Sequence, residues 1–289
     1  MINFIKIICT GIYSKRWLLA RRTVQLFILL AFLYHLPLIG DIATGNLSSS
    51  EWFSTIPLTD PFILLQSFLA GSPLAYPALI GGLIVAAFYA IFGGRIYCSW
   101  VCPINMLTDI AHWFRQRFDI KSNFSISKGL RKAILLLALL LSFSAGTLAW
   151  EIVNPITLFQ RELMWASISG SLFLLGLFFF DLLVSRRGWC GHICPVGAFY
   201  GFLGHFGRLR VTADKLESCA GSACSACMKV CPEPHVLVPV VSQKGNKVIS
   251  GECTRCGACL DNCSRGVLSM KMDLGHRRSF KNIPIVTKK

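Results

Sequence analysis

The chain has 289 residues, of which 54% are hydrophobic and only 15% are charged, and its mean hydropathy is +0.57. Soluble globular domains are about 45–50% apolar and about 25% charged, so the composition argues against an ordinary soluble domain and against a disordered chain. The 29 Lys and Arg outnumber the 14 Asp and Glu, and 13 cysteines are present. We therefore expect a membrane part joined to a cysteine-rich part.

Four apolar stretches predict four membrane-spanning helices. They cover about residues 23–39, 77–92 with a continuation toward residue 97, 133–150 and 166–184. A helix needs about 20 apolar residues to cross a bilayer, with a usual range of about 17–25. The expected fold class is an α-helical membrane protein, whose four transmembrane helices form two parallel repeats, with a C-terminal α+β two-cluster ferredoxin-like domain.

The basic residues predict the orientation of these helices. All of them except Arg161 lie before the first stretch, between the second and the third, or after the fourth. Lys and Arg concentrate in cytoplasmic loops, so we expect a multi-pass protein of the bacterial inner membrane with both termini and the ferredoxin domain in the cytoplasm. This explains the positive charge without a nucleic-acid partner. All the cysteines fall on the same side, where reduced thiols are available as metal ligands.

The expected domain organisation follows from these patterns. Residues 1–22 form a cytoplasmic N-terminal segment and residues 23–212 the four-helix membrane domain. Residues 213–275 form the ferredoxin-like domain, and residues 276–289 a basic tail.

An internal repeat divides the apolar region into two halves. Residues 98–103 (CSWVCP) match residues 190–195 (CGHICP) at an offset of 92, and residues 60–66 (DPFILLQ) match residues 154–160 (NPITLFQ) at an offset of 94. Each half therefore has the same order of elements. Parallel repeats of this kind are related by a pseudo-two-fold axis along the membrane normal, with a shared site at their interface.

The two C-x3-C-P motifs contain four cysteines whose role has two interpretations. Three intervening residues on a helix place both sulfurs of a pair on one face. Each pair can be a reversible dithiol, or the two pairs can converge on one shared redox centre or metal. The four residues are Cys98, Cys102, Cys190 and Cys194.

Eight further cysteines form two runs with ferredoxin spacing. In two-cluster ferredoxins the last cysteine of each run binds the other cluster, which predicts two [4Fe–4S] clusters, one held by Cys219, Cys224, Cys227 and Cys263 and the other by Cys253, Cys256, Cys259 and Cys231. Two extra residues separate Cys219 from Cys224, so Cys219 is the least regular ligand. A zinc site made of Cys224, Cys227, Cys253 and Cys256 is the alternative, and it leaves four cysteines unexplained.

The segments around these cysteines suggest a small α+β domain. Residues 236–241 and 247–250 flank a Gly-containing turn and predict a β-hairpin. The second cysteine run is expected on a turn followed by a helix. Residues 266–270 are expected to form a closing strand.

In its two C-x3-C-P motifs, four apolar spans and eight clustered cysteines, the chain resembles the NapH family of membrane-bound, ferredoxin-type quinol dehydrogenase components. Related membrane ferredoxins include a methylamine-utilisation protein. The resemblance implies oxidation of menaquinol or ubiquinol from the membrane pool. It also implies electron delivery, through a periplasmic iron–sulfur partner, toward a cytochrome or the periplasmic nitrate reductase, with the chain acting as an electron-transfer subunit. The alternative is a membrane ferredoxin for assembly or metal handling.

A quinol site needs an apolar slot and a proton acceptor. The candidates are Asp60, in the first of the repeated heptapeptides, and His35, near the end of the first apolar stretch. Asp60 is the titratable member of a set whose other members, Gln66, Asn154 and Gln160, are amides. A positioned carboxylate can act as a general base, so Asp60 is the stronger candidate.

Overall fold

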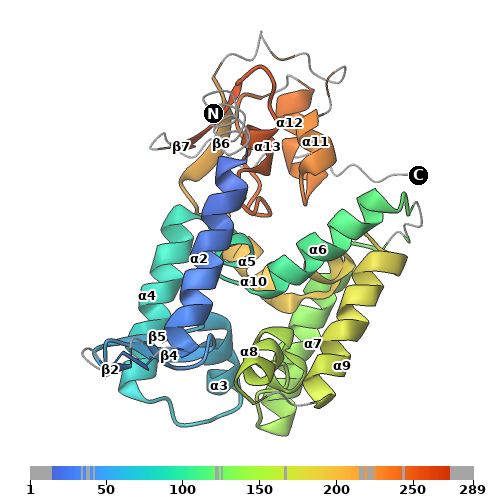
Figure 1. Ribbon diagram of the computed structural model, residues 1–289. Coiled ribbons are helices and arrows are strands. Elements are labelled where there is room, and N and C mark those ends of the chain that lie inside the picture. The colour runs from blue at the N-terminus through green and yellow to red at the C-terminus, as the bar shows by residue number, and fades with distance from the viewer. Residues whose placement is uncertain are drawn as a thin grey trace.

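The computed structural model describes residues 15–33, 35–36, 40–41, 43–120, 124, 126–165, 168–214, 219, 224, 226–242 and 245–273. A helical region makes up most of the molecule. The cysteine-rich C-terminal region, orange to red in Figure 1, lies at one end of it. The predicted basic tail and Cys9 fall outside the described residues.

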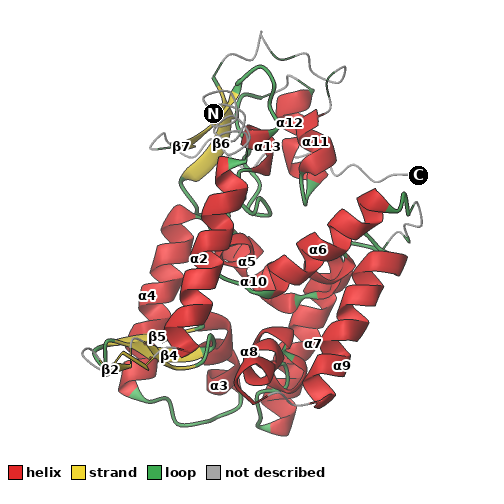
Figure 2. Ribbon diagram, viewed as in Figure 1, coloured by secondary structure: helices red, strands yellow, loops and turns green. Residues whose placement is uncertain are grey.

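The first half of the helical region contains a long helix, short strands and four further helices. In chain order they are α2 (Arg16–Leu33), β1 (His35–Leu36), β2 (Gly40–Asp41), β3 (Ala43–Gly45), β4 (Ser49–Trp52), β5 (Ile56–Thr59), α3 (Pro61–Leu69), α4 (Tyr76–Phe92), α5 (Ile96–Trp100) and α6 (Ile104–Arg117). Strands β3, β4 and β5 form an antiparallel sheet in which Ser49 pairs with Thr59. This sheet lies at the end of the molecule opposite the C-terminal region (Figure 2).

The second half repeats this plan without the sheet. Its elements are α7 (Leu130–Ala145), the 3-10 helix η1 (Glu151–Val153), α8 (Pro155–Trp165), α9 (Ile168–Phe179), the π-helices η2 (Phe180–Val184) and η3 (Trp189–Ile193), and α10 (Pro195–Leu203). Three contacts between elements of the first half have a counterpart in the second half. The contact of α3 with α4 corresponds to that of α8 with α9, the contact of α2 with α5 to that of α7 with η3, and the contact of α4 with α10 to that of α9 with α6.

The repeated heptapeptides begin matching helices for the same physical reason. Asp60 precedes α3, and its carboxylate accepts a hydrogen bond from the backbone N–H of Phe62. Asn154 precedes α8, and its carbonyl oxygen accepts from the N–H of Ile156. In each case the next residue is proline, which is favoured in the first helical turn because it has no N–H to leave unpaired.

The prediction of four transmembrane helices is wrong. Within the described residues, no helix combines the length and the apolar character needed to cross a membrane. Helix α2 has 18 residues but includes Arg16, Arg21 and Arg22, while α4, α7 and α9 have 17, 16 and 12 residues. Seventeen residues extend about 25 Å, against an apolar bilayer core of about 30 Å. The multi-pass inner-membrane localisation was derived from these helices, and this finding overturns it too.

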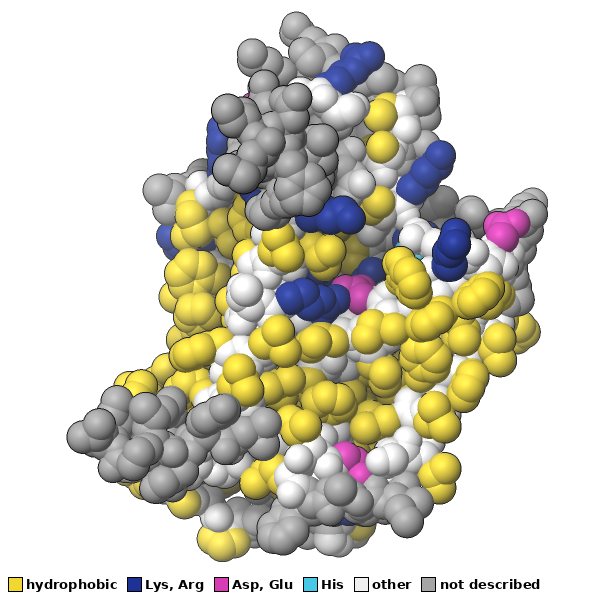
Figure 3. Space-filling model, viewed as in Figure 1, with side chains coloured by type: hydrophobic (Ala, Val, Ile, Leu, Met, Phe, Trp, Pro, Cys, Tyr) yellow, Lys and Arg dark blue, Asp and Glu magenta, His cyan; other side chains and the backbone are white. Residues whose placement is uncertain are grey.

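The apolar stretches are interrupted in ways that the composition did not reveal. The first leaves helical structure after Leu33, and the third ends at Gly146, whose φ of +64° terminates α7. The fourth changes from α-helix to π-helix at Phe180. Many apolar side chains lie on the surface, among them Phe27, Leu83, Phe143 and Leu172, and hydrophobic side chains form a broad band across the helical region in Figure 3.

The C-terminal region is built on a two-stranded sheet. It contains β6 (Leu209–Ala213), α11 (Ala226–Val230), the 3-10 helix η6 (Pro234–Leu237), α12 (Val238–Val241), α13 (Ala258–Asp261) and β7 (Leu268–Met272). Strand β7 pairs antiparallel with β6, so the closing strand expected at residues 266–270 is present. The hairpin expected at residues 236–250 is wrong, because residues 234–241 are helical and Pro239 has no N–H to donate to a strand.

Each region has its own apolar core. The core of the helical region is centred on Phe62, Ile104, Val196 and Tyr200. The core of the C-terminal region is centred on Val211, Leu237, Val240 and Val248, and it contains Cys231 and Cys259. The two regions meet where α13 packs against the first turns of α2.

Candidate redox site

The eight cysteines of the C-terminal region line two separate cavities. The first cavity is lined by Cys219, Cys224, Cys227 and Cys263, and the second by Cys231, Cys253, Cys256 and Cys259. These groups coincide with the two ligand sets predicted from the spacing, including the irregular Cys219. The iron-binding role of each cysteine stays a prediction, and the donor set of four thiols around each cavity fits a [4Fe–4S] cluster.

The four cysteines of the zinc alternative do not share a cavity: Cys224 and Cys227 line the first, whereas Cys253 and Cys256 line the second. Tetrahedral Zn²⁺ with Zn–S distances of about 2.3 Å brings its sulfurs to about 3.8 Å from one another. Among the described residues, no three cysteine sulfurs all lie within 4.8 Å of one another. An iron–sulfur cluster holds its ligands farther apart, so the separation of these thiols favours clusters over the zinc alternative.

The loop that carries three ligands of the second cavity has the backbone it needs. Gly257, between Cys256 and α13, has a φ of +75°, and a Cβ at this position would lie 2.3 Å from the side chain of Trp17. Only glycine combines this left-handed conformation with such a close approach. Trp17 on α2 therefore packs directly against the cysteine loop.

The four C-x3-C-P cysteines converge in the core of the helical region. Cys102 is buried, and Cys98, Cys190 and Cys194 pack against the same cluster. Burial raises the pKa of all four thiols, and each of the six pairs among them interacts electrostatically. The pseudo-symmetric placement predicted from the repeat thus brings the two pairs together, whereas the chemistry they perform stays a prediction.

Buried donors without an acceptor surround these cysteines. Among the described residues, no partner is found for three N–H groups close to the motifs, Nε of Arg95, Nε of Arg131 and Nε1 of Trp189, nor for the ring nitrogen Nδ1 of His192. Buried polar groups are normally hydrogen-bonded. A bound group with acceptor atoms, such as the sulfides of a cluster, would satisfy donors at this position.

A larger cavity of about 330 Å³ lies beside the first C-x3-C-P motif. Its walls are mostly apolar and come from α2, the sheet, α4, α5 and α10, with Phe32, Trp52, Val85 and Phe88 among them. Tyr97 and Val101, next in sequence to Cys98 and Cys102, form part of the same wall. The cavity therefore borders on the first C-x3-C-P motif.

Asp60 is the carboxylate of this cavity. Its Oδ1 accepts hydrogen bonds from the N–H of Phe62 at 2.9 Å and from the hydroxyl of Tyr200 at 3.1 Å. No donor for Oδ2 is found among the described residues. Burial raises the pKa of Asp60 to about 6, against the lowering effect of the two hydrogen bonds. At neutral pH it is thus a partly desolvated base whose second oxygen is available.

Three tyrosines line the cavity beside Asp60, and the sequence analysis missed them. The rings of Tyr97 and Tyr200 stack with their centroids 4.8 Å apart, and Tyr89 meets both rings edge-on. Burial raises the pKa of each hydroxyl, so all three remain protonated donors. Their only sequence signal was proximity to the motifs, since Tyr97 precedes Cys98 and Tyr200 follows Cys194 by six residues.

The other polar candidates do not line this cavity. Gln66 is fully buried and accepts from the N–H of Trp150 and the hydroxyl of Ser142, while Gln160 accepts from the N–H of Leu47. Each glutamine thus joins its own half to the other. The amide of Asn154 donates to Glu151 and to Thr157. The side chain of His35 lies outside the described part of the chain.

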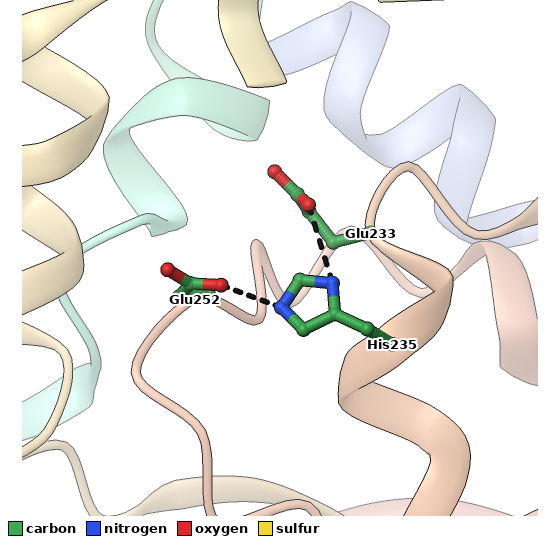
Figure 4. Close-up of side chains that lie close together, drawn as sticks. All are labelled: Glu233, His235 and Glu252. Carbon is green, nitrogen blue, oxygen red and sulfur yellow. Dashed lines mark hydrogen bonds and ion pairs between the residues drawn. The ribbon is translucent and has the colours of Figure 1, made fainter. Parts of the chain in front are cut away.

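A cluster of Glu233, His235 and Glu252 lies close enough together to suggest a metal site (Figure 4). Its carboxylates already face three basic side chains: Arg95, Lys128 and Arg131 all pair with Glu233, and Arg131 also pairs with Glu252. These ion pairs lower the pKa of both carboxyl groups. A cation would have to displace them, so the cluster is an ion-pair network between the two regions.

Comparison with known proteins identifies related sequences over nearly the whole chain. The chain is 63% identical to the methylamine utilization ferredoxin-type protein MauN of Methylobacillus flagellatus over 96% of its length and 97% of that protein. It is 46% identical to the ferredoxin-type protein NapH of Escherichia coli, over 89% of the chain and 90% of that protein. MauN of Paracoccus denitrificans is also 46% identical, over 83% of the chain and 84% of that protein.

The family described as a 4Fe-4S binding domain matches the chain twice, at residues 74–121 and 166–212. The two matches begin 92 residues apart, the offset of the C-x3-C-P motifs, and each contains one of those motifs. The internal repeat is therefore confirmed, and each half of the helical region carries one match to this family. No solved structure matches the chain.

Proposed function

The chain belongs to the family of ferredoxin-type iron–sulfur electron-transfer proteins that includes NapH and MauN, and we propose that it oxidises a quinol bound in the cavity beside Asp60. The observation that supports this most is the position of one buried carboxylate in a mostly apolar cavity whose wall includes Val101 of the first C-x3-C-P motif. A quinol ring and its apolar tail need such a slot, and its hydroxyl groups need a base.

The residues proposed to hold the two [4Fe–4S] clusters are the cysteines of the two C-terminal cavities. When bound, two such clusters supply two one-electron acceptors for the two electrons that leave a quinol as it becomes a quinone. Of the two protons released, Asp60 accepts one and the other leaves to solvent. The protein's own part is to bind the ring, to exclude water and to accept a proton.

Asp60 and Tyr200 divide this work. The hydroxyl of Tyr200 and the N–H of Phe62 hold Oδ1 of Asp60 in place, and Oδ2 accepts a proton from the quinol hydroxyl. Because the pKa of Asp60 is about 6, the carboxylate is mostly ionised at pH 7 and still basic enough to take the proton.

We also infer a shared redox centre at Cys98, Cys102, Cys190 and Cys194. The convergence of the four thiols, the unsatisfied buried donors around them and the family match over both motifs support it. Two [4Fe–4S] clusters contain about eight iron atoms. Changing all four cysteines to Ser should remove the iron that the protein binds beyond this number. An unchanged iron content would refute a shared centre and favour dithiol chemistry.

We infer that electrons leave toward a partner redox protein. The resemblance to NapH suggests a periplasmic iron–sulfur subunit and the nitrate reductase. The identity is higher with MauN, a protein of methylamine utilization, than with NapH, and this favours a partner in methylamine utilization.

The test is anaerobic addition of menaquinol or ubiquinol to the purified protein, followed by EPR of the clusters. We expect reduced-cluster signals that develop with quinol and are absent with quinone. Clusters that dithionite reduces but neither quinol reduces would overturn the quinol proposal and favour a ferredoxin for assembly or metal handling. A colourless protein with stoichiometric zinc would overturn the cluster proposal itself.

A further inference from the structure

The first C-x3-C-P motif is hydrogen-bonded to the loop that lines the second cysteine cavity. The hydroxyl of Ser99 donates to the carbonyl of Thr254 at 2.7 Å, and Nε1 of Trp100 donates to the carbonyl of Arg255 at 3.2 Å. Thr254 and Arg255 lie between Cys253 and Cys256. These two bonds place the second cavity at the junction with the first C-x3-C-P motif.

Arg95 lies at the centre of this junction, three residues before Cys98. Its guanidinium donates to Oε1 of Glu233 at 2.8 Å and to the carbonyl of Glu252 at 3.0 Å, both in the C-terminal region. It also donates to the carbonyl of Cys190 at 3.3 Å, in the second C-x3-C-P motif. With 2% of its side chain exposed, Arg95 thus joins both motifs to the segments that carry Cys231 and Cys253.

The charges around Arg95 leave a net positive site. Arg95, Lys128 and Arg131 face Glu233 and Glu252, and His235 bridges the two carboxylates. With His235 neutral, three positive charges meet two negative ones. Arg131 reinforces the arrangement, since it donates to the carbonyl of Gly191 and to both carboxylates.

We propose that Arg95 is a positioning residue that fixes the Cys253–Cys259 loop against the C-x3-C-P cysteines and raises the reduction potential of the group bound in the second cavity. A fixed positive charge favours the reduced form of a cluster, because reduction adds a negative charge. The proposal rests on cluster binding by the C-terminal cysteines and does not depend on quinol oxidation.

The repeat supplies a matched control. Arg187 occupies the position of Arg95 in the second half, at the same offset of 92. It pairs instead with Asp109 at 2.6 Å, within the helical region. One arginine of the pair therefore connects the two cysteine sites, whereas its counterpart pairs with an acidic residue of the helical region itself.

The experiment compares Arg95→Gln, Arg95→Lys and Arg187→Gln in the full chain. Each variant is titrated with dithionite and mediator dyes while the cluster EPR is recorded, so that no quinol is required. We expect Arg95→Gln to shift one of the two cluster potentials to a more negative value and to leave the other in place. Arg95→Lys should recover most of the shift, and Arg187→Gln should match the unmodified protein.

Two results would overturn the proposal. One is a set of identical potentials in Arg95→Gln and the unmodified protein at equal iron content. The other is a shift of both cluster potentials that is equally large in Arg95→Gln and in Arg187→Gln. Such a result would indicate a general loss of structure. If Arg95→Gln loses iron, Lys128→Gln serves instead: Lys128 is 39% exposed, and its removal should give a smaller shift in the same direction. No shift in that variant would also count against the proposal.

Discussion

The two halves of the helical region share a plan, and a single pair of corresponding residues shows how far they differ in chemistry. Asp60 and Asn154 each begin a helix by accepting a backbone N–H. Asp60 then lines an apolar cavity and meets Tyr200, whereas the amide of Asn154 is bound to Glu151 and Thr157. The features that the two halves share therefore determine where the helices begin. The difference between them, a carboxylate at Asp60 and an amide at Asn154, indicates the candidate catalytic group.

The largest expected effect comes from making the first half resemble the second. Asp60→Asn keeps an oxygen that can accept from Phe62 and Tyr200, so α3 should form normally, but the base is lost. General-base catalysis contributes about 10²–10⁴-fold, and we expect quinol-dependent cluster reduction to fall at least about 100-fold. Stopped-flow absorbance of the clusters measures this rate.

The control for this variant is the reverse change, Asn154→Asp. The new carboxylate cannot donate to Glu151 as the amide does, so stability is lost, but residue 154 does not line the cavity. We therefore expect the quinol-dependent rate of the folded variant to stay within about twofold of the unmodified protein. If Asp60→Asn retained the full rate, Asp60 would have no part in the reaction.

The glutamines that connect the two halves provide the second comparison. Gln66 accepts from two groups, the N–H of Trp150 and the hydroxyl of Ser142, and Gln160 accepts from the N–H of Leu47. Leaving a buried donor unpaired costs about 1–3 kcal/mol. Gln66→Leu should therefore lower the free energy of unfolding by about 2 kcal/mol, and Gln160→Leu by less, as measured by denaturant titration. Equal losses would show that the second bond at Gln66 contributes nothing.

The third comparison concerns Tyr200 and its counterpart Thr108. The hydroxyl of Tyr200 lowers the pKa of Asp60, so Tyr200→Phe should raise that pKa above about 6. The acidic limb of the pH–rate profile should move to higher pH, and for a rise of about one pH unit the rate at pH 7 should fall by about twofold at most. Thr108→Val is the control, because its hydroxyl donates to the carbonyl of Asn105 and should leave the profile in place. A lower rate with an unmoved limb would assign Tyr200 a packing role.

The sequence predicted those features that local chemistry determines. The closing strand β7 and the grouping of the eight cysteines into two sets both follow from residue type and spacing. The internal repeat was visible because two motifs recur at nearly the same offset, and the family match at both positions confirms it.

Features that depend on distant contacts were not predictable. The four membrane-spanning helices were inferred from apolar composition. The average hydropathy of a stretch does not indicate where a helix ends, and α2 ends at Leu33 while α7 ends just before Gly146. The expected hairpin is helical because Val236, Leu237, Val240 and Val241 pack into the core of the C-terminal region. Tyr200 reaches Asp60 across 140 positions of sequence, and no local pattern indicates such a contact.

The smallest expected effect is the pH dependence of stability that Asp60 contributes. Its pKa is about 6 in the folded protein, above the ordinary value of 3.8 for an aspartate, so the folded state binds the proton more tightly than the unfolded state does. The resulting stabilisation is complete below about pH 4 and is lost as the pH rises through about 6. Between pH 5 and pH 8 this loss amounts to about 1 kcal/mol.

Asp60→Asn removes this titration, and Asn154 shows that an amide is accepted at the corresponding position. The difference in unfolding free energy between the variant and the unmodified protein should therefore change by about 1 kcal/mol in favour of the variant from pH 5 to pH 8. Denaturant titrations at the two pH values measure it, and all other titrating groups cancel in the difference. A constant difference would mean that Asp60 has an ordinary pKa, and its proposed role as a base poised near neutral pH would lose its physical basis.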